Sequence, residues 1–173
     1  ESINWRAKIL GAKDISAMAE ALGSLLRITL DHRSKQVPLQ KELELIQYYI
    51  TIQKYRFEDR LNFQTDIPQN LLSCYVLKLT LQPLVENAVQ HGIHDCMETG
   101  KIRMSIHKDG DDLEIIVSDN GAGMTQEMIR SVMAGKARNN GEDRYSTGIA
   151  VGNVIDRLEL YYKQKDLLTI ESE

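Results

Sequence analysis

The stretch Asp119-Asn120-Gly121-Ala122-Gly123-Met124 places a carboxylate and two glycines directly after an apolar, alternating segment. Leu113, Ile115 and Val117 share one face by the two-residue period of a strand, and Asp119 has the same parity. The pattern therefore predicts an aspartate that points inward from the end of a strand. Because a buried carboxylate without a partner is costly, a protein or ligand donor must lie opposite it.

The two glycines of this stretch allow the backbone to approach a flat group closely. Gly121 and Gly123 have no Cβ atom and can adopt positive φ without a steric penalty. A carboxylate beside such a glycine floor suits the amino group of a purine. A tight turn whose aspartate caps a helix at Thr125 explains the same residues, so this stretch alone leaves both interpretations open.

The bulk composition is ordinary for a globular protein, with 42% hydrophobic and 27% charged residues in 173. This length suffices for one core, or for a core domain with a helical appendage. The net charge of −4 argues against general nucleic-acid binding and against a polybasic membrane anchor. No apolar run reaches the roughly 18 to 20 residues of a membrane span. Cys74 and Cys96 form neither a Cys-x-x-Cys pair nor a disulfide framework, which fits a reducing compartment.

Two amphipathic helices are expected in the first third of the chain, over residues 14–30 and from Pro38 to Phe57. Apolar residues recur there at helical spacing: Ile15, Met18, Leu22, Leu25 and Leu26, then Leu39, Leu43, Ile46, Ile50 and Phe57. Such stripes predict a helical hairpin or part of a bundle. The period changes to two at Leu61, so we expect a helical region over 1–58 and a second domain over 59–173.

The second domain is expected to mix strands and helices. A strand over 61–67 precedes a helix that begins after Thr80 and ends near Gly92. The buried side of this helix comprises Leu81, Leu84, Val85, Ala88 and Val89. Strands over 102–106 and 113–118 form an antiparallel hairpin that turns at Asp109-Gly110.

After the glycine stretch, the pattern predicts a short helix capped by Thr125 and ending at Met133. Residues 135–147 carry Asn, Gly and charges of both signs, which is typical of a mobile loop. A helix from Gly148 follows, with an apolar side formed by Val151, Val154, Ile155, Leu158 and Tyr161 or Tyr162. Leu168 and Ile170 are expected to begin another strand.

A polar patch is expected on the helix that begins after Thr80. Asn87, Gln90 and His91 lie at i, i+3 and i+4, so they emerge together beside the apolar side. A solvated helix face explains this pattern as well as a binding site does.

The order of these elements is more specific than any single one. The strings LQPLVENAVQHGI (Leu81 to Ile93) and GIAVGNVIDRLELYY (Gly148 to Tyr162) resemble the sensor histidine kinases of the LytS-like class. VPLQKELELIQYYITIQKYRF (Val37 to Phe57) is similar to the segment that joins the dimerisation helix of that class to its ATPase domain. The resemblance implies an α+β fold: a two-layer α/β sandwich of the Bergerat ATP-binding type, shared with type II topoisomerases and heat-shock chaperones, preceded by a helical hairpin segment.

The resemblance also implies roles for particular residues. Asp119 would accept the exocyclic amine of adenine, Asn87 would present its side-chain oxygen to Mg²⁺, and loop 135–147 would be the lid over ATP. Backbone amides from Gly148 to Val151 would bind phosphate at a helix N-terminus. The full expected binding set is Asn87, Gln90, His91, Asp119, Gly121, Gly123, Met124, Thr147, Gly148, Ile149, Ala150 and Val151.

Two positions depart from the commonest pattern of the family. Gln90 stands where many histidine kinases have a Lys or Arg against the phosphates, and Ala150 stands where a second glycine is frequent. Both departures predict weaker nucleotide binding. His91 stands where the family has a Tyr or His near the base, although a surface histidine at a helix end is the plainer interpretation.

A histidine kinase needs an acceptor histidine, and none of His32, His91, His94 and His107 stands in the family's acceptor motif. Residues 1–5 resemble the segment that immediately follows that motif. We therefore expect this chain to bind ATP without phosphorylating itself. In the intact protein the resemblance implies a homodimer, a response regulator as partner, no nucleic acid, and membrane attachment only through upstream segments of a cytoplasmic kinase core.

Three other readings remain. A hydrolysing Bergerat ATPase would carry a glutamate one turn before Asn87, but Pro83 occupies that position and Glu86 is adjacent to the asparagine, so a catalytic role for Glu86 is a weaker alternative. A degenerate kinase used as a nucleotide-binding scaffold is the second. A dinucleotide site lacks its third glycine, and a zinc site from His91, His94, Asp95 and Cys96 lacks a second paired cluster.

Overall fold

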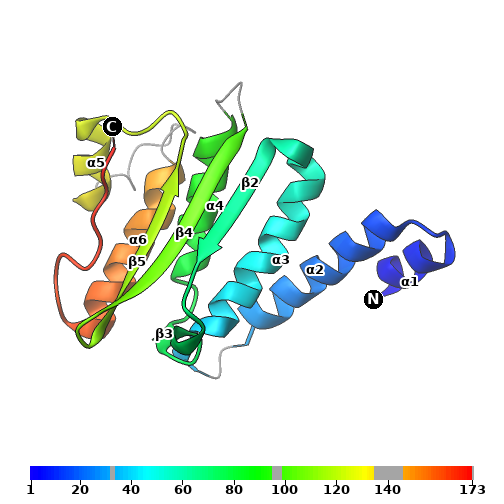
Figure 1. Cartoon of the computed structure of the whole chain (residues 1–173), viewed down its shortest axis with the longest axis horizontal. Coiled ribbons are helices and arrows are strands. Elements are labelled where there is room, and N and C mark those ends of the chain that lie inside the picture. Colours follow the sequence, from blue (N-terminus) through cyan, green and yellow to red (C-terminus); the bar gives the residue numbers. More distant parts are fainter. Residues whose placement is uncertain (32–33, 95–98, 135–145, 173) are drawn as a thin grey trace.

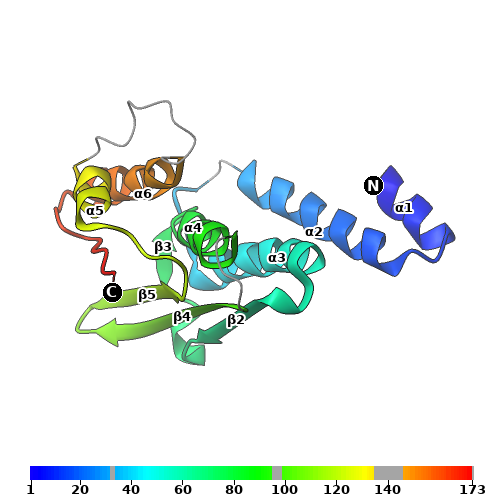
Figure 2. The same ribbon diagram turned by 90° about the horizontal axis from the view of Figure 1, so that it is seen from above.

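A computed structural model describes residues 1–31, 34–94, 99–134 and 146–172, with the backbone alone at 92–94 and 146–149. A three-stranded sheet forms one layer, built from β2 (Leu61–Asp66), β4 (Gly100–Asp109) and β5 (Asp112–Asp119). Helices α3 (Leu39–Phe57), α4 (Leu81–His94) and α6 (Ser146–Tyr162) form the other layer, and they lie on one side of the sheet (Figures 1 and 2). This arrangement confirms the expected α+β two-layer sandwich.

The sheet has the strand order β2-β4-β5. β4 and β5 pair antiparallel from Ile102 opposite Asp119 to Asp109 opposite Asp112, and Gly110 turns between them with φ of +58°. The predicted hairpin and its turn are therefore confirmed. β2 pairs with β4 in parallel, and α4 belongs to the connection between these two strands.

The main core lies between the sheet and two helices. Ile102, Met104 and Ile106 of β4 are fully buried and pack against Leu81 and Val85 of α4 within one cluster. α3 contributes to the same cluster with residues spaced along one of its faces: Leu39, Ile46 and Ile50. Because α3 and β2 share this core, the domain boundary near Glu58 stays a prediction.

The N-terminal helices are α1 (Ser2–Ile9) and α2 (Lys13–Thr29), and α2 packs against both α1 and α3. α1 was not predicted from the sequence, whereas the pairing of α2 with α3 gives the expected helical hairpin. Ile15, Leu22 and Leu26 of α2 remain 53%, 52% and 54% exposed. The apolar stripe of α2 is thus covered only in part.

Several short elements complete the fold. A small antiparallel sheet pairs β1 (Gln36–Pro38) with β3 (Tyr75–Leu77), and single turns of 3-10 helix form η1 (Glu58–Arg60) and η2 (Gln69–Leu71). α5 (Gln126–Met133) packs against α6. No helix among the described residues is both long and apolar enough to cross a membrane.

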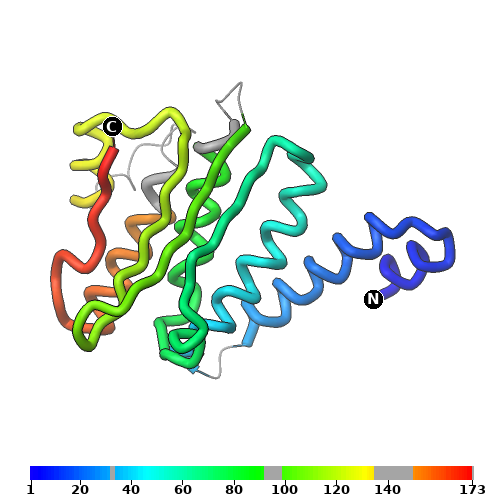
Figure 3. The backbone as a smooth tube through the Cα atoms, viewed as in Figure 1, coloured from blue at the N-terminus to red at the C-terminus, as the bar shows by residue number. Residues whose placement is uncertain are grey.

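A second, smaller core joins α5, α6 and the C-terminal segment. Val132, Val151 and Ile155 are buried together, with Leu84 of α4 at its border. Leu168 and Ile170 pack on the same cluster, and residues 163–172 contain no strand, so the predicted strand there is wrong. Their alternating apolar pattern is satisfied by this cluster in place of a ladder. Figure 3 shows the segment running back from the end of α6 toward α5.

Candidate functional site

α4 carries the predicted polar patch. Asn87 is half-buried, and among the described residues two side-chain oxygens are buried without a hydrogen-bond partner: Oδ1 of Asn87 and Oε1 of Gln82, about one and a half turns earlier on α4. His91 is half-buried and Gln90 is exposed. An unpaired buried amide oxygen is costly, so its retention points to a ligand. An amide oxygen is a ligand that suits a hard divalent cation.

Glu86, next to Asn87, is held within its own helix. Gln82 Nε2 donates a hydrogen bond of 2.6 Å to Glu86 Oε1. Burial, and then the nearby Glu86 carboxylate, raise the pKa of Tyr49 on α3 above its ordinary value, while Arg56 lowers it slightly. Tyr49 therefore stays a neutral phenol near Glu86 at ordinary pH.

Asp119 is exposed, contrary to the inward position expected from its parity. β5 is one of the two edge strands of the sheet, and its inward apolar residues are only half-buried. Asp119 is its last residue, so the helix layer leaves this carboxylate exposed. Asp119 Oδ1 accepts a hydrogen bond of 2.9 Å from the Gly121 amide. Within the described chain, Oδ2 makes no hydrogen bond, which leaves one carboxylate oxygen for a ligand.

The turn after β5 is fixed at both ends. Asn120 Oδ1 accepts a hydrogen bond of 2.6 Å from the Lys101 amide, and Asn120 Nδ2 donates one of 3.3 Å to the Thr99 carbonyl. The Met124 amide donates a hydrogen bond of 2.8 Å to Ser172 Oγ. Gly123 adopts φ of +71°, the left-handed conformation that glycine favours. Sequence reasoning assigned Asn120 no role, although a polar residue between Asp119 and a glycine is a typical turn signal.

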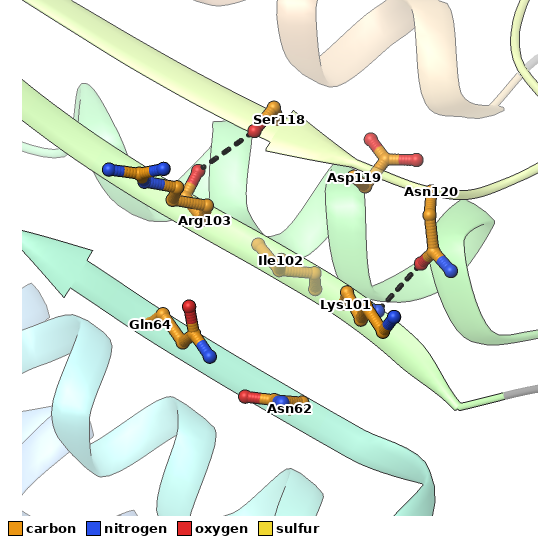
Figure 4. A pocket seen from close by; sticks show the side chains of 8 residues that line it. All are labelled: Asn62, Gln64, Lys101, Ile102, Arg103, Ser118, Asp119 and Asn120. Atoms are coloured by element: carbon orange, nitrogen blue, oxygen red, sulfur yellow. Dashed lines mark hydrogen bonds between the residues drawn. The ribbon is translucent and has the colours of Figure 1, made fainter.

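A shallow hollow of about 220 Å³ lies beside this turn, but on the other face of the sheet (Figure 4). Its lining is mainly polar: Asn62, Gln64, Lys101, Ile102, Arg103, Ser118, Asp119 and Asn120. In Figure 4 the Asp119 side chain points away from Asn62 and Gln64. Asn87 and the glycines of the turn do not line this hollow, so Asp119 is the one residue that it shares with the expected nucleotide site.

α6 begins at Ser146, two residues earlier than expected. The first amides of a helix lack acceptors within it and can bind an anion. Thr147, Gly148, Ile149, Ala150 and Val151 all lie in the first two turns of α6, and their phosphate contacts stay a prediction. Residues 135–145, which hold most of the expected lid, lie outside the described residues, and so do Asp95 and Cys96 of the zinc alternative.

Three of the predicted parts come together in space. α4 packs against β5 and against α6. The end of β5, the second half of α4 and the start of α6 lie toward the same end of the molecule (Figure 1). The C-terminal half of α4, the turn over 119–124 and the start of α6 thus border one region, and Asn87 lies at the middle of α4.

The cap of α5 supplies a stability prediction. Thr125 Oγ1 accepts a hydrogen bond of 3.2 Å from the Met128 amide, as the sequence predicted. Thr125→Ala is expected to lower the free energy of unfolding by about 1 kcal/mol, because one helix amide loses its acceptor. Urea denaturation measures this, and Thr125→Ser, which keeps the hydroxyl, should remain near the native value. Equal stability of the alanine variant and the native chain would contradict the capping role.

Comparison with known proteins extends these observations. Residues 1–61 match the family model described as "Histidine kinase", and residues 76–159 match the model described as "Histidine kinase-, DNA gyrase B-, and HSP90-like ATPase". The catalytic domain of the histidine kinase ThkA has a similar fold, with a TM-score of 0.51 at 16% identity over 70% of this chain and 79% of that chain.

Two curated relatives are similar in sequence. The sensor histidine kinase YesM of Bacillus subtilis is 38% identical over 100% of this chain, which corresponds to 28% of YesM. The sensor protein LytS of Oceanobacillus iheyensis is 33% identical over 79% of this chain and 23% of LytS. The chain thus spans about a quarter of the length of these relatives. Sequence, fold and family matches agree, and the chain belongs to the sensor histidine kinases of the LytS-like class, whose ATP-binding fold it carries.

Proposed function

We propose that this chain is the part of a two-component sensor kinase that binds Mg-ATP and presents its γ-phosphoryl group to a histidine elsewhere in the intact protein. The observation that carries the proposal is the buried, unpartnered Oδ1 of Asn87 on α4. This oxygen lies on the helix that packs against β5, whose end bears Asp119. A ligand for each group would therefore approach the same region.

The residues present fit a magnesium ion. Asn87 would hold it through its amide oxygen, and the other positions would be filled by water and by phosphate oxygens, as this ion prefers. When bound, the ion would neutralise phosphate charge. Gln90 adds no positive charge on this helix, so the ion would carry more of that task than in kinases with a Lys or Arg there.

Asp119 and its turn would hold the base. Oδ1 is engaged by Gly121, so Oδ2 is the oxygen that would accept the adenine amine. Gly121, Gly123 and Met124 would line the base through the backbone of the turn, and His91 would approach it from α4. The first amides of α6 would receive phosphate oxygens, favoured by the helix dipole.

Phosphoryl transfer requires positioning more than covalent help from this domain. A bond forms between the acceptor imidazole nitrogen and the γ-phosphorus, the bond from that phosphorus to the bridging oxygen breaks, and ADP leaves with the electron pair. We propose that Glu86, held by Gln82, polarises the incoming imidazole. The histidines of this chain lie outside the family's acceptor motif, so the acceptor belongs to the longer protein.

The partners follow from the same proposal. The partly exposed apolar stripe of α2 would pair with a second copy in the intact protein, since amphipathic helices bury such stripes in bundles. A response regulator would receive the phosphoryl group. We place this core on the cytoplasmic side of an integral membrane protein, attached through segments outside this chain.

Calorimetric titration of the chain with Mg-ATP and with Mg-GTP tests the proposal. We expect saturable binding of ATP, weaker than low micromolar because of Gln90 and the Ala150 position. Binding of GTP should be much weaker, because guanine presents a carbonyl oxygen where adenine presents an amine to the Asp119 carboxylate. No heat at millimolar ATP, or equal affinity for the two nucleotides, would overturn it.

A further inference from the structure

A buried carboxylate from α3 caps the helix that carries Asn87. Glu42 is 1% exposed. Its Oε1 accepts a hydrogen bond of 2.8 Å from the Leu79 amide, and Oε2 accepts bonds of 3.0 and 3.1 Å from the amides of Thr80 and Leu81. Three donors and the positive end of α4 offset the cost of burying this charge.

A residue of α6 also holds this turn. Arg157 Nη1 donates a hydrogen bond of 2.8 Å to the Leu79 carbonyl, and Arg157 Nη2 donates to the Lys78 carbonyl. Leu79 adopts φ of +57°, a backbone conformation that residues other than glycine rarely adopt. The hydrogen bonds around the turn hold it in this conformation. Glu42 accepts hydrogen bonds from the amides of the turn, and Arg157 donates hydrogen bonds to its carbonyls.

The turn is also tied to the end of the helical region. Lys78 is 9% exposed, and its Nζ donates to the Asp31 carbonyl, two residues after α2 ends. The Lys78 amide donates a hydrogen bond of 2.9 Å to the Lys35 carbonyl. Figure 1 shows the end of α2 and the starts of α3 and α4 gathered around β3, away from the end of β5.

We propose that this joint, formed by Glu42, the turn over 78–81 and Arg157, sets the position of the nucleotide site relative to the helical region. The proposal rests on the function proposed above. Asn87 lies six residues after Leu81 on α4, a rise of about 9 Å along a rigid helix. A shift of α3 moves Glu42, and Glu42 moves the first turn of α4 and therefore Asn87.

Arg157 extends the joint to the second phosphate-binding element. It belongs to α6, whose first amides are proposed to bind phosphate, and it fixes α6 to the turn that begins α4. Glu42 and Arg157 are thus positioning residues for the two helices that would contact Mg-ATP. Because coupling is reciprocal, occupancy of the nucleotide site also biases the position of α3.

The test compares two dissociation constants for ATP on each variant, one with excess Mg²⁺ and one with EDTA. The ratio of these constants reports the contribution of the metal and hence the placement of Asn87. Glu42→Gln keeps the size of the side chain but turns one acceptor into a donor that faces backbone amides. We expect Glu42→Gln to weaken Mg-ATP binding about tenfold and to bring the ratio close to one.

Two controls separate positioning from general loss of stability. Leu45→Ala removes a buried side chain from α3 and should lower the melting temperature while the ratio stays native. Glu44→Gln makes the same chemical change on the partly exposed side of α3, where Glu44 pairs with Lys41, and should alter neither. A native ratio in Glu42→Gln, with only a lower melting temperature, would show a purely structural cap and overturn the inference.

A second variant keeps the test decisive if Glu42→Gln does not fold. Arg157→Lys keeps the charge of an exposed side chain but loses the planar fork that reaches two carbonyls. Its Mg-ATP constant should rise several-fold at a near-native melting temperature, and an unchanged constant would count against the joint. Failure of the native chain to bind ATP at all would instead remove the proposed function.

Discussion

Replacing Asp119 with asparagine is expected to weaken Mg-ATP binding by about 10- to 100-fold, because a hydrogen bond to a charged group contributes about 1.5 to 3 kcal/mol. Asp119 Oδ1 already accepts the Gly121 amide. An asparagine that keeps this bond turns its NH₂ group toward the adenine amine, so two donors face each other. An asparagine whose side-chain amide is flipped presents its oxygen to adenine but loses the hydrogen bond from the Gly121 amide. Calorimetry on the variant chain measures the loss.

The control for this change is Asp112→Asn, which removes the same charge from the other end of β5. It should bind Mg-ATP like the native chain. The melting temperature of Asp119→Asn without nucleotide should stay close to native, since the carboxylate is exposed. If Asp119→Asn binds Mg-ATP as tightly as the native chain, this aspartate only stabilises its own turn and does not contact the base.

Replacing Asn87 with alanine is expected to abolish most of the magnesium-dependent affinity for ATP while making the empty protein no less stable. The change removes a buried oxygen that has no partner, and alanine is the better helix former by roughly 0.5 kcal/mol. The free energy of unfolding of the variant should therefore equal that of the native chain or exceed it by about 1 kcal/mol. Titration with ATP in Mg²⁺ and in EDTA, together with urea denaturation, measures both effects.

Gln53→Ala supplies the matched control, because it removes a half-buried amide from α3, a helix that carries none of the proposed binding residues. It should leave nucleotide binding unchanged. A large loss of stability in Asn87→Ala would mean that the amide holds the fold together, and the argument for a ligand at this oxygen would then fail. Opposite signs for binding and stability are typical of a residue kept for function.

Local patterns predicted the elements of the second domain well. The buried side of α4, the turn at Gly110 and the cap at Thr125 all follow from residues within a few positions of one another, and each is confirmed, except that Leu84 of α4 is only half-buried. Helical spacing and turn chemistry act over that range, so the sequence displays them directly.

The elements that were missed depend on partners far away in the chain. β1 and β3 are three residues each and pair across about forty positions, which leaves no local pattern to read. Leu168 and Ile170 alternate like a strand but are buried by a helix cluster, because alternation reports burial on one side and does not identify what covers it.

For the candidate site, the structure tests the expected geometry, and the roles of the individual residues stay predictions. The resemblance pointed to Asn87 and Asp119, but parity placed Asp119 inside, whereas an edge strand leaves it exposed at its end. Glu42 escaped notice although it stands between Leu39 and Ile46 on the apolar side of its helix. A carboxylate at such a position signals a buried acceptor, and only the fold shows that it caps α4.

The two separate cores have a consequence for motion. α5, α6 and the C-terminal segment share a small cluster that includes Leu84 of α4 but is separate from the larger one, so we expect this part to open at a lower cost than global unfolding. The part formed by α5, α6 and the C-terminal segment can thus open locally while the sheet, α3 and α4 keep their packing. Smaller side chains around Val151 would lower the stability of this part and leave the main core between the sheet, α3 and α4 unchanged.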